Sequence, residues 1–224
     1  MARTKRVAVI LSGCGVFDGS EIHEATLSLL ALDQHGAVAI VVAPDVAQAK
    51  VYDHASARDA AGETRNVLVE SGRIARGNIR PVASLSPDDV DAVLLPGGFG
   101  AALNLSTLAT AGADLSVEPT TLAFLKAAYQ GGKPLGALCI APPILAKVLA
   151  ELGVKGARMT IGNDPATAAV IAALGQTHVT CAATSFVADP GRRIVTSPAY
   201  MVAGGIAELW MGINAAVEAL LEMA

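Results

Sequence analysis

Short runs of apolar residues alternate along the chain with segments whose apolar residues recur at helical spacing. We expect buried strands, which are continuous and rich in β-branched or small apolar residues, over 6–11, 37–43, 91–95 and 134–138. We expect helices, with apolar side chains on one face, over 21–34 and 119–130, after Pro142, and over about 204–222. Apolar strands separated by helices predict an α/β fold in which a mostly parallel sheet is covered on both faces.

Two segments interrupt this alternation. Residues 44–90 are longer than a simple crossover needs and contain a helix candidate around Thr64–Ala75. Residues 179–197 place Asp189-Pro190-Gly191 between two β-prone runs, which predicts a hairpin. Because no Gly-, Ser- or charge-rich linker and no internal repeat is present, we expect a single domain over residues 1–224.

Composition narrows the class of protein. Of the 224 residues, 53% are hydrophobic and 16% charged, which favours a large buried core over disorder. The net charge of −4, with no basic run beyond residues 3–6, argues against a nucleic-acid partner. Three cysteines without a C-x-x-C pair, and four scattered histidines, predict neither a disulfide framework nor a metal site. This cysteine usage suits a reducing, cytoplasmic location.

The first fifteen residues imitate a bacterial export signal. Basic residues precede the apolar run 7–11, and Ser12-Gly13-Cys14 resembles a lipoprotein cleavage site. The run is shorter than the 7–15 residues of a signal core, so we interpret it as a buried strand. No stretch of 18 uncharged apolar residues is present, so we expect no membrane span.

Cys139 is the strongest candidate for a nucleophile. It lies where an apolar strand ends and Pro142 begins a helix, with small Ala137 and Ala141 two residues to either side. A nucleophile on a sharp strand-to-helix turn needs small neighbours at those positions, and we expect a strained backbone there. The helix N-terminus would lower the thiol pKa and make Cys139 the most readily oxidised cysteine. The alternative from the residues alone is a buried structural cysteine.

Two glycine-rich loops and a carboxyl group are expected at the same sheet edge. The loop 13–19 resembles a dinucleotide fingerprint, but its acidic residues favour a glycine turn followed by helix capping. The loop 96–100 follows another parallel strand, so its backbone N–H groups could hold an oxyanion beside Cys139. Glu24 lies on the first helical turn, where a carboxyl group held against a thiol would have a raised pKa. The alternative for Glu24 is a solvated helix start.

These residues together resemble a known family. The motifs are 19–24 (GSEIHE), 96–101 (PGGFGA), 136–142 (GALCIAP), 12–15 (SGCG), 64–68 (TRNVL) and 196–201 (TSPAYM). They look like the ThiJ/PfpI superfamily of class I glutamine-amidotransferase-like proteins, and within it the ElbB-type glyoxalases associated with isoprenoid biosynthesis. The resemblance implies a flavodoxin-like three-layer sandwich with a nucleophile elbow. It also implies Cys139 as nucleophile, Glu24 as acid/base, and the Gly98 and Ile140 N–H groups as oxyanion donors.

The resemblance implies a glyoxalase function, whereas one departure from the family pattern argues against peptidase or glutaminase activity. Protease- and amidotransferase-like relatives often place a histidine directly after the nucleophile, where this chain has Ile140, so peptidase or glutaminase activity is disfavoured. His23 need not face the cysteine. We expect a cofactor-free, glutathione-independent glyoxalase whose small dicarbonyl substrates, glyoxal or methylglyoxal, are converted to glycolate or lactate. We also expect a cytoplasmic homodimer without membrane or nucleic-acid partners. The alternative is a redox-sensing or chaperone-like protein with Cys139 as an oxidisable thiol. Cys14, in the loop after the first strand, could be a cleft-wall residue or a resolving thiol for oxidised Cys139. We favour the plainer interpretation, a small residue in a glycine-flanked turn.

Overall fold

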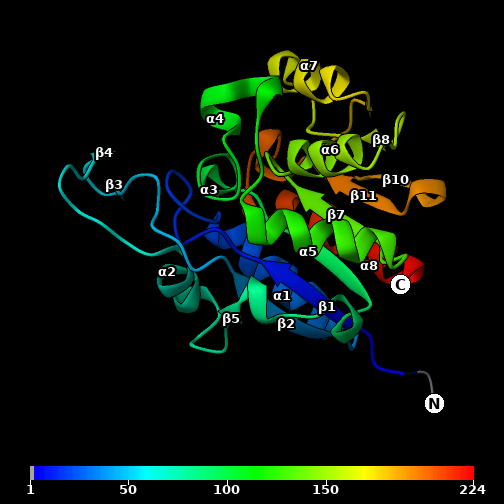
Figure 1. Cartoon of the computed structure of the whole chain (residues 1–224), viewed down its shortest axis with the longest axis horizontal. Helices are drawn as coiled ribbons and strands as arrows, with labels where there is room; N and C mark the ends of the chain where they lie inside the picture. Colours follow the sequence, from blue (N-terminus) through cyan, green and yellow to red (C-terminus); the bar gives the residue numbers. More distant parts are fainter. Residues whose placement is uncertain (1–2) are drawn as a thin grey trace.

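A seven-stranded sheet runs through the centre of the computed structural model, which describes residues 3–224 (Figure 1). Its strand order is β10-β11-β7-β6-β1-β2-β5, and all neighbours are parallel except β10, which pairs antiparallel with β11. The strands of this sheet are β1 (Arg6–Ile10), β2 (Val38–Ala43), β5 (Arg80–Pro81), β6 (Ala92–Leu95), β7 (Leu135–Leu138), β10 (Val187–Asp189) and β11 (Ile194–Ser197).

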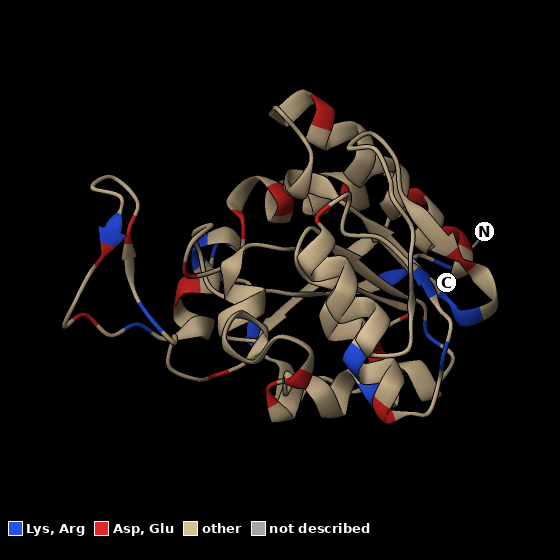
Figure 2. Ribbon diagram, turned by 90° about the horizontal axis from the view of Figure 1, so that it is seen from above, with Lys and Arg blue, Asp and Glu red and all other residues tan. Residues whose placement is uncertain are grey.

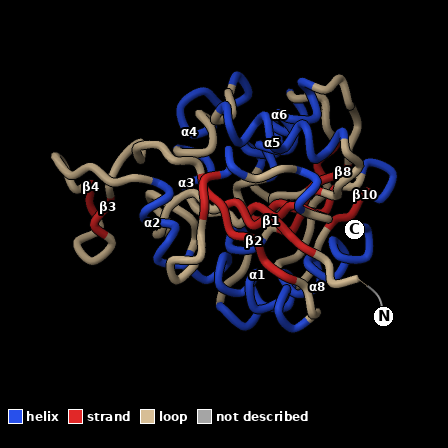
Figure 3. Tube along the Cα trace, turned by 60° about the horizontal axis from the view of Figure 1, so that its bottom comes forward, coloured by secondary structure: helices blue, strands red, loops and turns tan. Residues whose placement is uncertain are grey.

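Helices cover both faces of this sheet, as Figure 3 shows, with α1 and α8 on one side and α5 and α6 on the other. The α-helices are α1 (Ile22–Gln34), α2 (Val67–Ile74), α3 (Phe99–Leu103), α4 (Leu108–Ala111), α5 (Pro119–Gln130), α6 (Pro142–Glu151), α7 (Pro165–Ala173) and α8 (Ile206–Met223). This arrangement confirms the predicted α/β sandwich with a mostly parallel sheet.

The apolar strands fill two separate hydrophobic layers. In β1, Ala8 and Ile10 pack with the residues of α5 and α6, whereas Val7 and Val9 pack with those of α1 and α8. Successive side chains of a strand point to opposite faces, so a strand buried on both faces must be apolar at every position. That requirement explains why residues 7–11 are apolar at every position and do not alternate between apolar and polar.

Two small pairs of strands lie outside the main sheet. One is an antiparallel arm, β3 (Tyr52–Asp53) and β4 (Arg58–Asp59), that projects from the body in all three overall views (Figures 1–3). The other is the parallel pair β8 (Arg158–Met159) and β9 (Thr177–His178). Lys and Arg are dispersed among Asp and Glu along the ribbon in Figure 2. Among residues 3–224, no helix is long and apolar enough to cross a membrane.

The predicted elements agree with the structure to within a few residues, and the differences have identifiable causes. The helix candidate around Thr64–Ala75 is α2, which begins after the N-cap Asn66, whose side chain accepts from the N–H of Val69. The hairpin is β10–β11, but residues 179–186 are not strand. Helix α7 was not predicted, because its apolar residues surround the helix instead of marking one face.

Candidate active site

Four neighbouring strands of the sheet, β1, β6, β7 and β11, end at one edge, and the segments that follow them form the candidate site. Cys139 directly follows β7 and adopts a left-handed backbone conformation with φ of 57°, which is unusual for a residue other than glycine. Its N–H donates to the carbonyl oxygen of Ser197 at the end of β11, at 3.0 Å. The strained turn predicted for Cys139 is therefore confirmed, and the sulfur belongs to a buried residue at the sheet edge.

Glu24 is fully buried beside this turn. Helix α1 begins after Glu21, which is its N-cap and accepts from the N–H of Glu24 at 2.7 Å. The Oε2 atom of Glu24 accepts from the N–H of Gly97 at 2.8 Å, and Oε1 accepts from the N–H of Tyr200 at 3.2 Å. The Glu24 carboxyl group is also a hydrogen-bond partner of the Cys139 thiol. The structure thus brings the two predicted residues together, and the solvated helix start considered for Glu24 is wrong.

Gly97 leaves the space in which these two side chains meet. A Cβ atom at Gly97 would lie 2.4 Å from Cys139 Cβ, 2.7 Å from Glu24 Oε2 and 3.0 Å from Cys139 Sγ. All three distances are too short for carbon in van der Waals contact. The glycine is therefore required by the approach of the carboxyl group to the sulfur.

Two backbone N–H groups lie close enough to the Cys139 sulfur to favour its charged form and so counter the rise of its pKa. They belong to Gly98 and Ile140, the two residues named as oxyanion donors from the sequence. Gly98 has φ of 95°, in the region that favours glycine, and it is the N-cap of α3. A tetrahedral oxyanion formed next to the sulfur would lie within reach of both donors.

Burial sets the protonation of the pair. Desolvation, followed by the neighbouring Glu21 carboxylate, raises the pKa of Glu24 to about 7, in the direction predicted from the sequence. Desolvation and the Glu24 carboxylate also raise the pKa of Cys139, so the expected low thiol pKa is wrong for the free protein. Helix α6 begins with Pro142 and Pro143, which have no N–H groups, so its first turn offers the sulfur fewer donors than an ordinary helix start.

Tyr200 is a residue of this site to which the sequence argument gave no role. Tyr200 follows β11 and Ala199, which is buried and has φ of 45°. Its hydroxyl group is hydrogen-bonded to Nδ1 of His23 at 2.9 Å, while its N–H holds Glu24. His23 is half exposed, and its hydrogen bond is to Tyr200 and not to Cys139. The left-handed Ala199 carries no sequence signal, because alanine rarely adopts this conformation.

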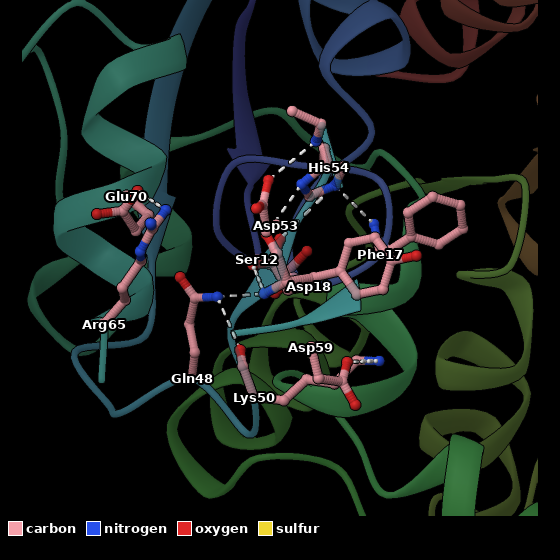
Figure 4. Close-up of polar contacts among 12 residues, drawn as sticks. Ser12, Phe17, Asp18, Gln48, Lys50, Asp53, His54, Asp59, Arg65 and Glu70 are labelled. Atoms are coloured by element: carbon pink, nitrogen blue, oxygen red, sulfur yellow. Dashed lines mark hydrogen bonds and ion pairs between the residues drawn. The ribbon is translucent and has the colours of Figure 1, made fainter. Parts of the chain in front are cut away.

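The loop after β1 is a tight structural turn, as predicted, and Figure 4 shows how it is held. Asp18 is buried: its Oδ2 atom accepts from the N–H of Tyr52 at 2.8 Å, and its carbonyl oxygen accepts from the side chain of Asn104. Glu21 caps α1, so one carboxylate oxygen of Asp18 and one of Glu21 accept hydrogen bonds within the protein, whereas Oδ1 of Asp18 is buried without a hydrogen-bond partner among the described residues. The arm that begins at Tyr52 is thereby tied to the loop between β1 and α1.

The other two cysteines are partly exposed, whereas Cys139 is buried. Cys14, Cys139 and Cys181 are all free, and burial raises the pKa of Cys14 and of Cys181. The charged groups that influence Cys14 include Glu70 and Arg73 of α2. Within residues 3–224, no cluster of three or more His, Cys, Asp or Glu side chains is placed to hold a metal ion.

Comparison with known proteins gives relatives over nearly the whole chain, although no family model matches it. The human mitochondrial glutamine amidotransferase-like class 1 domain-containing protein 3 is 44% identical over 97% of this chain and 83% of its own length. The mitochondrial ES1 protein homolog of Rattus norvegicus is 42% identical over 97% of this chain and 84% of its own length. Both relatives are named as mitochondrial, so the expected cytoplasmic location is not confirmed.

Solved structures agree with these relatives. An isoprenoid biosynthesis protein with an amidotransferase-like domain from Ehrlichia chaffeensis superposes with a TM-score of 0.89 at 34% identity, covering 98% of this chain and 100% of that one. DJ-1beta of Drosophila melanogaster shares the fold, with a TM-score of 0.53 at 20% identity over 99% of this chain and 96% of that one. The chain therefore belongs to the glutamine amidotransferase-like class 1 domain family, whose fold is that of the ThiJ/PfpI and DJ-1 proteins.

Proposed function

We propose that the protein is a cofactor-free, glutathione-independent glyoxalase of the ElbB type, acting on glyoxal or methylglyoxal. The observation that carries this proposal is the surroundings of the Cys139 sulfur, which has the Glu24 carboxyl group and the N–H groups of Gly98 and Ile140 close to it. A nucleophile, a proton carrier and an oxyanion site are the three groups that carbonyl addition requires.

The first step is addition of sulfur to an aldehyde. Glu24 has a pKa of about 7, so near neutral pH it is partly ionised and can take the thiol proton as Cys139 attacks the carbonyl carbon. The C=O double bond becomes a C–O single bond, and the resulting hemithioacetal oxyanion lies against the Gly98 and Ile140 N–H groups. No separate low-pKa thiolate is needed, because the proton moves to the adjacent carboxyl group during attack.

The second step moves hydrogen within the substrate. Glu24 first gives the proton taken from the thiol to the hemithioacetal oxyanion, which restores its carboxylate. The base of the next transfer, which we assign to this carboxylate, removes the proton from the former aldehyde carbon to give an enediolate. The acid form of Glu24 then returns that proton to the neighbouring carbon, while the hydroxyl proton of the former aldehyde carbon moves to the oxygen of its neighbour. The aldehyde carbon is oxidised to a thioester and its neighbour is reduced to an alcohol. Water then hydrolyses the thioester to glycolate or lactate, and the Cys139 thiol is regenerated. Because the redox change is internal, the reaction balances without an external oxidant or reductant.

Two features distinguish this proposal from other activities of the superfamily. Ile140 has no imidazole to serve as the base of a peptidase or glutaminase. The buried sulfur and its raised pKa give no support to the redox-sensing alternative, which relies on an accessible thiolate. We include in the proposal the homodimer and the cytoplasmic location expected from the sequence, which sedimentation analysis and cell fractionation would test.

The proposal is tested by measuring glyoxal consumption and glycolate formation for the native protein and for Cys139→Ala. Tris and other amine buffers must be excluded, because amines themselves consume the aldehyde. We expect glycolate to form in proportion to glyoxal lost, and to be absent with Cys139→Ala. Equal rates for the two proteins, or aldehyde loss without glycolate, would contradict the proposal.

A further inference from the structure

A small cavity lies next to the two oxyanion donors and has no role in the chemistry described so far. It has a volume of about 210 Å³ and lies among α3, α4, α7 and the residue after the nucleophile. In Figure 1, α4 lies above α3, and α7 lies above α6; α3 packs with α4, and α6 packs with α7. The side chains that the argument uses belong to Phe99, Ala109, Ile140, Ala166, Thr167 and Val170.

The cavity adjoins the donors through the chain itself. Phe99 directly follows Gly98 and lines the cavity. The N–H of Ile140 is the other group close to the sulfur, and Ile140 also lines the cavity. A carbonyl group whose oxygen lay between the two donors would therefore lie next to two residues of the cavity lining.

The lining determines what the cavity can accept. No lining residue carries a charge, and Thr167 is the one with a polar side chain. The volume equals that of about seven water molecules at about 30 Å³ each in the liquid. Glyoxal has no substituent to place there, and the methyl group of methylglyoxal would leave most of the space unfilled.

We propose that this cavity, named here the side pocket, binds an uncharged apolar substituent of the substrate. The preferred substrates are then 2-oxoaldehydes with a chain of about four carbons or a ring, rather than glyoxal itself. This inference rests on the proposed function, because it assigns the substrate class of the same site. The bond changes are those given above: sulfur adds to the terminal aldehyde, the neighbouring ketone becomes the alcohol, and water releases the 2-hydroxy acid.

Substrate preference provides the first test. Methylglyoxal and butylglyoxal share a reactive group, and each buried methylene group is worth about fourfold in binding, or up to about sixtyfold for three. We expect kcat/KM for butylglyoxal to exceed that for methylglyoxal by at least about tenfold. A ratio near one would overturn the inference.

Matched variants of α7 locate the preference in the side pocket. Ala166 and Ala172 are both exposed on this helix, but only Ala166 lines the pocket. Ala166→Leu should fill the pocket and reduce the butyl-to-methyl ratio at least about fivefold, and Ala109→Leu, at a lining residue of α4, should have the same effect. Ala172→Leu makes the same change on the same helix and should leave the ratio as in the native protein. A ratio that responds to Ala172→Leu, or that does not respond to the two lining variants, would overturn the assignment.

An alkylation experiment separates this inference from the proposed function. Chloromethyl ketones with a methyl or a butyl group alkylate a thiol by forming an S–C bond as the C–Cl bond breaks and chloride leaves. Their alkylation rates at Cys139 are followed by mass spectrometry and divided by their rates with a small free thiol. The corrected rates measure the preference for the butyl group in the side pocket and do not depend on turnover. If no dicarbonyl is turned over but the butyl reagent is preferred and Ala166→Leu removes the preference, the proposed function fails and the side pocket stands. If dicarbonyls are turned over without either preference, the side pocket fails and the proposed function stands.

Discussion

Replacing Glu24 by Gln should change how the stability of the protein depends on pH. Glu24 is fully buried, and its pKa is raised from 4.5 to about 7. Below pH 4.5 the carboxyl group is protonated in both the folded and the unfolded state, so burial of the acid carries no ionisation penalty. As the pH rises toward and through 7, the unfolded state gives up its proton more readily, and the folded state loses stability.

The size of the effect follows from the shift. Each pKa unit corresponds to about 1.36 kcal/mol, so the native protein should lose about 2.5 kcal/mol of unfolding free energy between pH 5 and pH 8 through this group. Glu24→Gln has no such titration. Its amide must also face one of the N–H donors of Gly97 and Tyr200, which lowers stability at every pH by about 1–3 kcal/mol. The pH-dependent part of the difference between the two proteins therefore isolates the buried carboxyl group.

Denaturant unfolding of both proteins at pH 5, 6, 7 and 8 measures this difference. We expect the free energy of unfolding of the variant, relative to that of the native protein, to increase by about 2.5 kcal/mol from pH 5 to pH 8. Titrating groups common to both proteins cancel in the subtraction. A difference that stays constant over this range would show that Glu24 does not hold its proton near neutral pH, and would refute the assigned acid/base role.

Three further predictions concern turnover of glyoxal. Gly97→Ala should lower kcat about a hundredfold, because its Cβ would separate Cys139 from Glu24. Gly205→Ala, where a Cβ meets open space, should have little effect, and equal losses of kcat in the two variants would contradict the role given to Gly97. The kcat/KM profile should rise as the pH passes about 7, since the ionised Glu24 must accept the thiol proton, and a profile that is flat from pH 6 to pH 8 would be evidence against it. Cys14→Ser should retain most of the activity that Cys139→Ala abolishes, and equal damage in a folded Cys14→Ser protein would mean that a second thiol takes part.

The sheet and its flanking helices were predictable because burial on both faces imposes an unbroken apolar pattern. Residues 7–11 show this pattern, and their pairing with β2 and β6 places the loops after these strands at one edge. Cys139 could be placed at the turn from the residues around it, because small residues two positions to either side and a following proline are typical of such a turn. Its approach to Glu24 followed from topology, since both residues lie beside the carboxyl ends of neighbouring strands.

The remaining features of the site depend on tertiary contacts that leave little trace in the sequence. Tyr200 reaches Glu24 because Ala199 adopts a left-handed conformation, and alanine gives no local indication of it. The thiol pKa was predicted in the wrong direction because the helix start was considered without the desolvation of the sulfur, which is the larger influence. The arm of β3 and β4 was missed because strands of two residues are too short to show a period.

The central claim is that Cys139 forms a covalent bond to the aldehyde and that Glu24 carries the following proton transfer. Intact-protein mass spectrometry of the native protein and of Glu24→Gln after brief exposure to glyoxal, followed by reductive trapping and peptide mapping, tests this claim most directly. We expect one glyoxal unit on Cys139 of the native protein and much less in Glu24→Gln, because the amide cannot take the thiol proton during attack. No adduct should form at that position in Cys139→Ala. An adduct found equally on Cys14 and Cys181, or none on Cys139 while the native protein still forms glycolate, would contradict the claim.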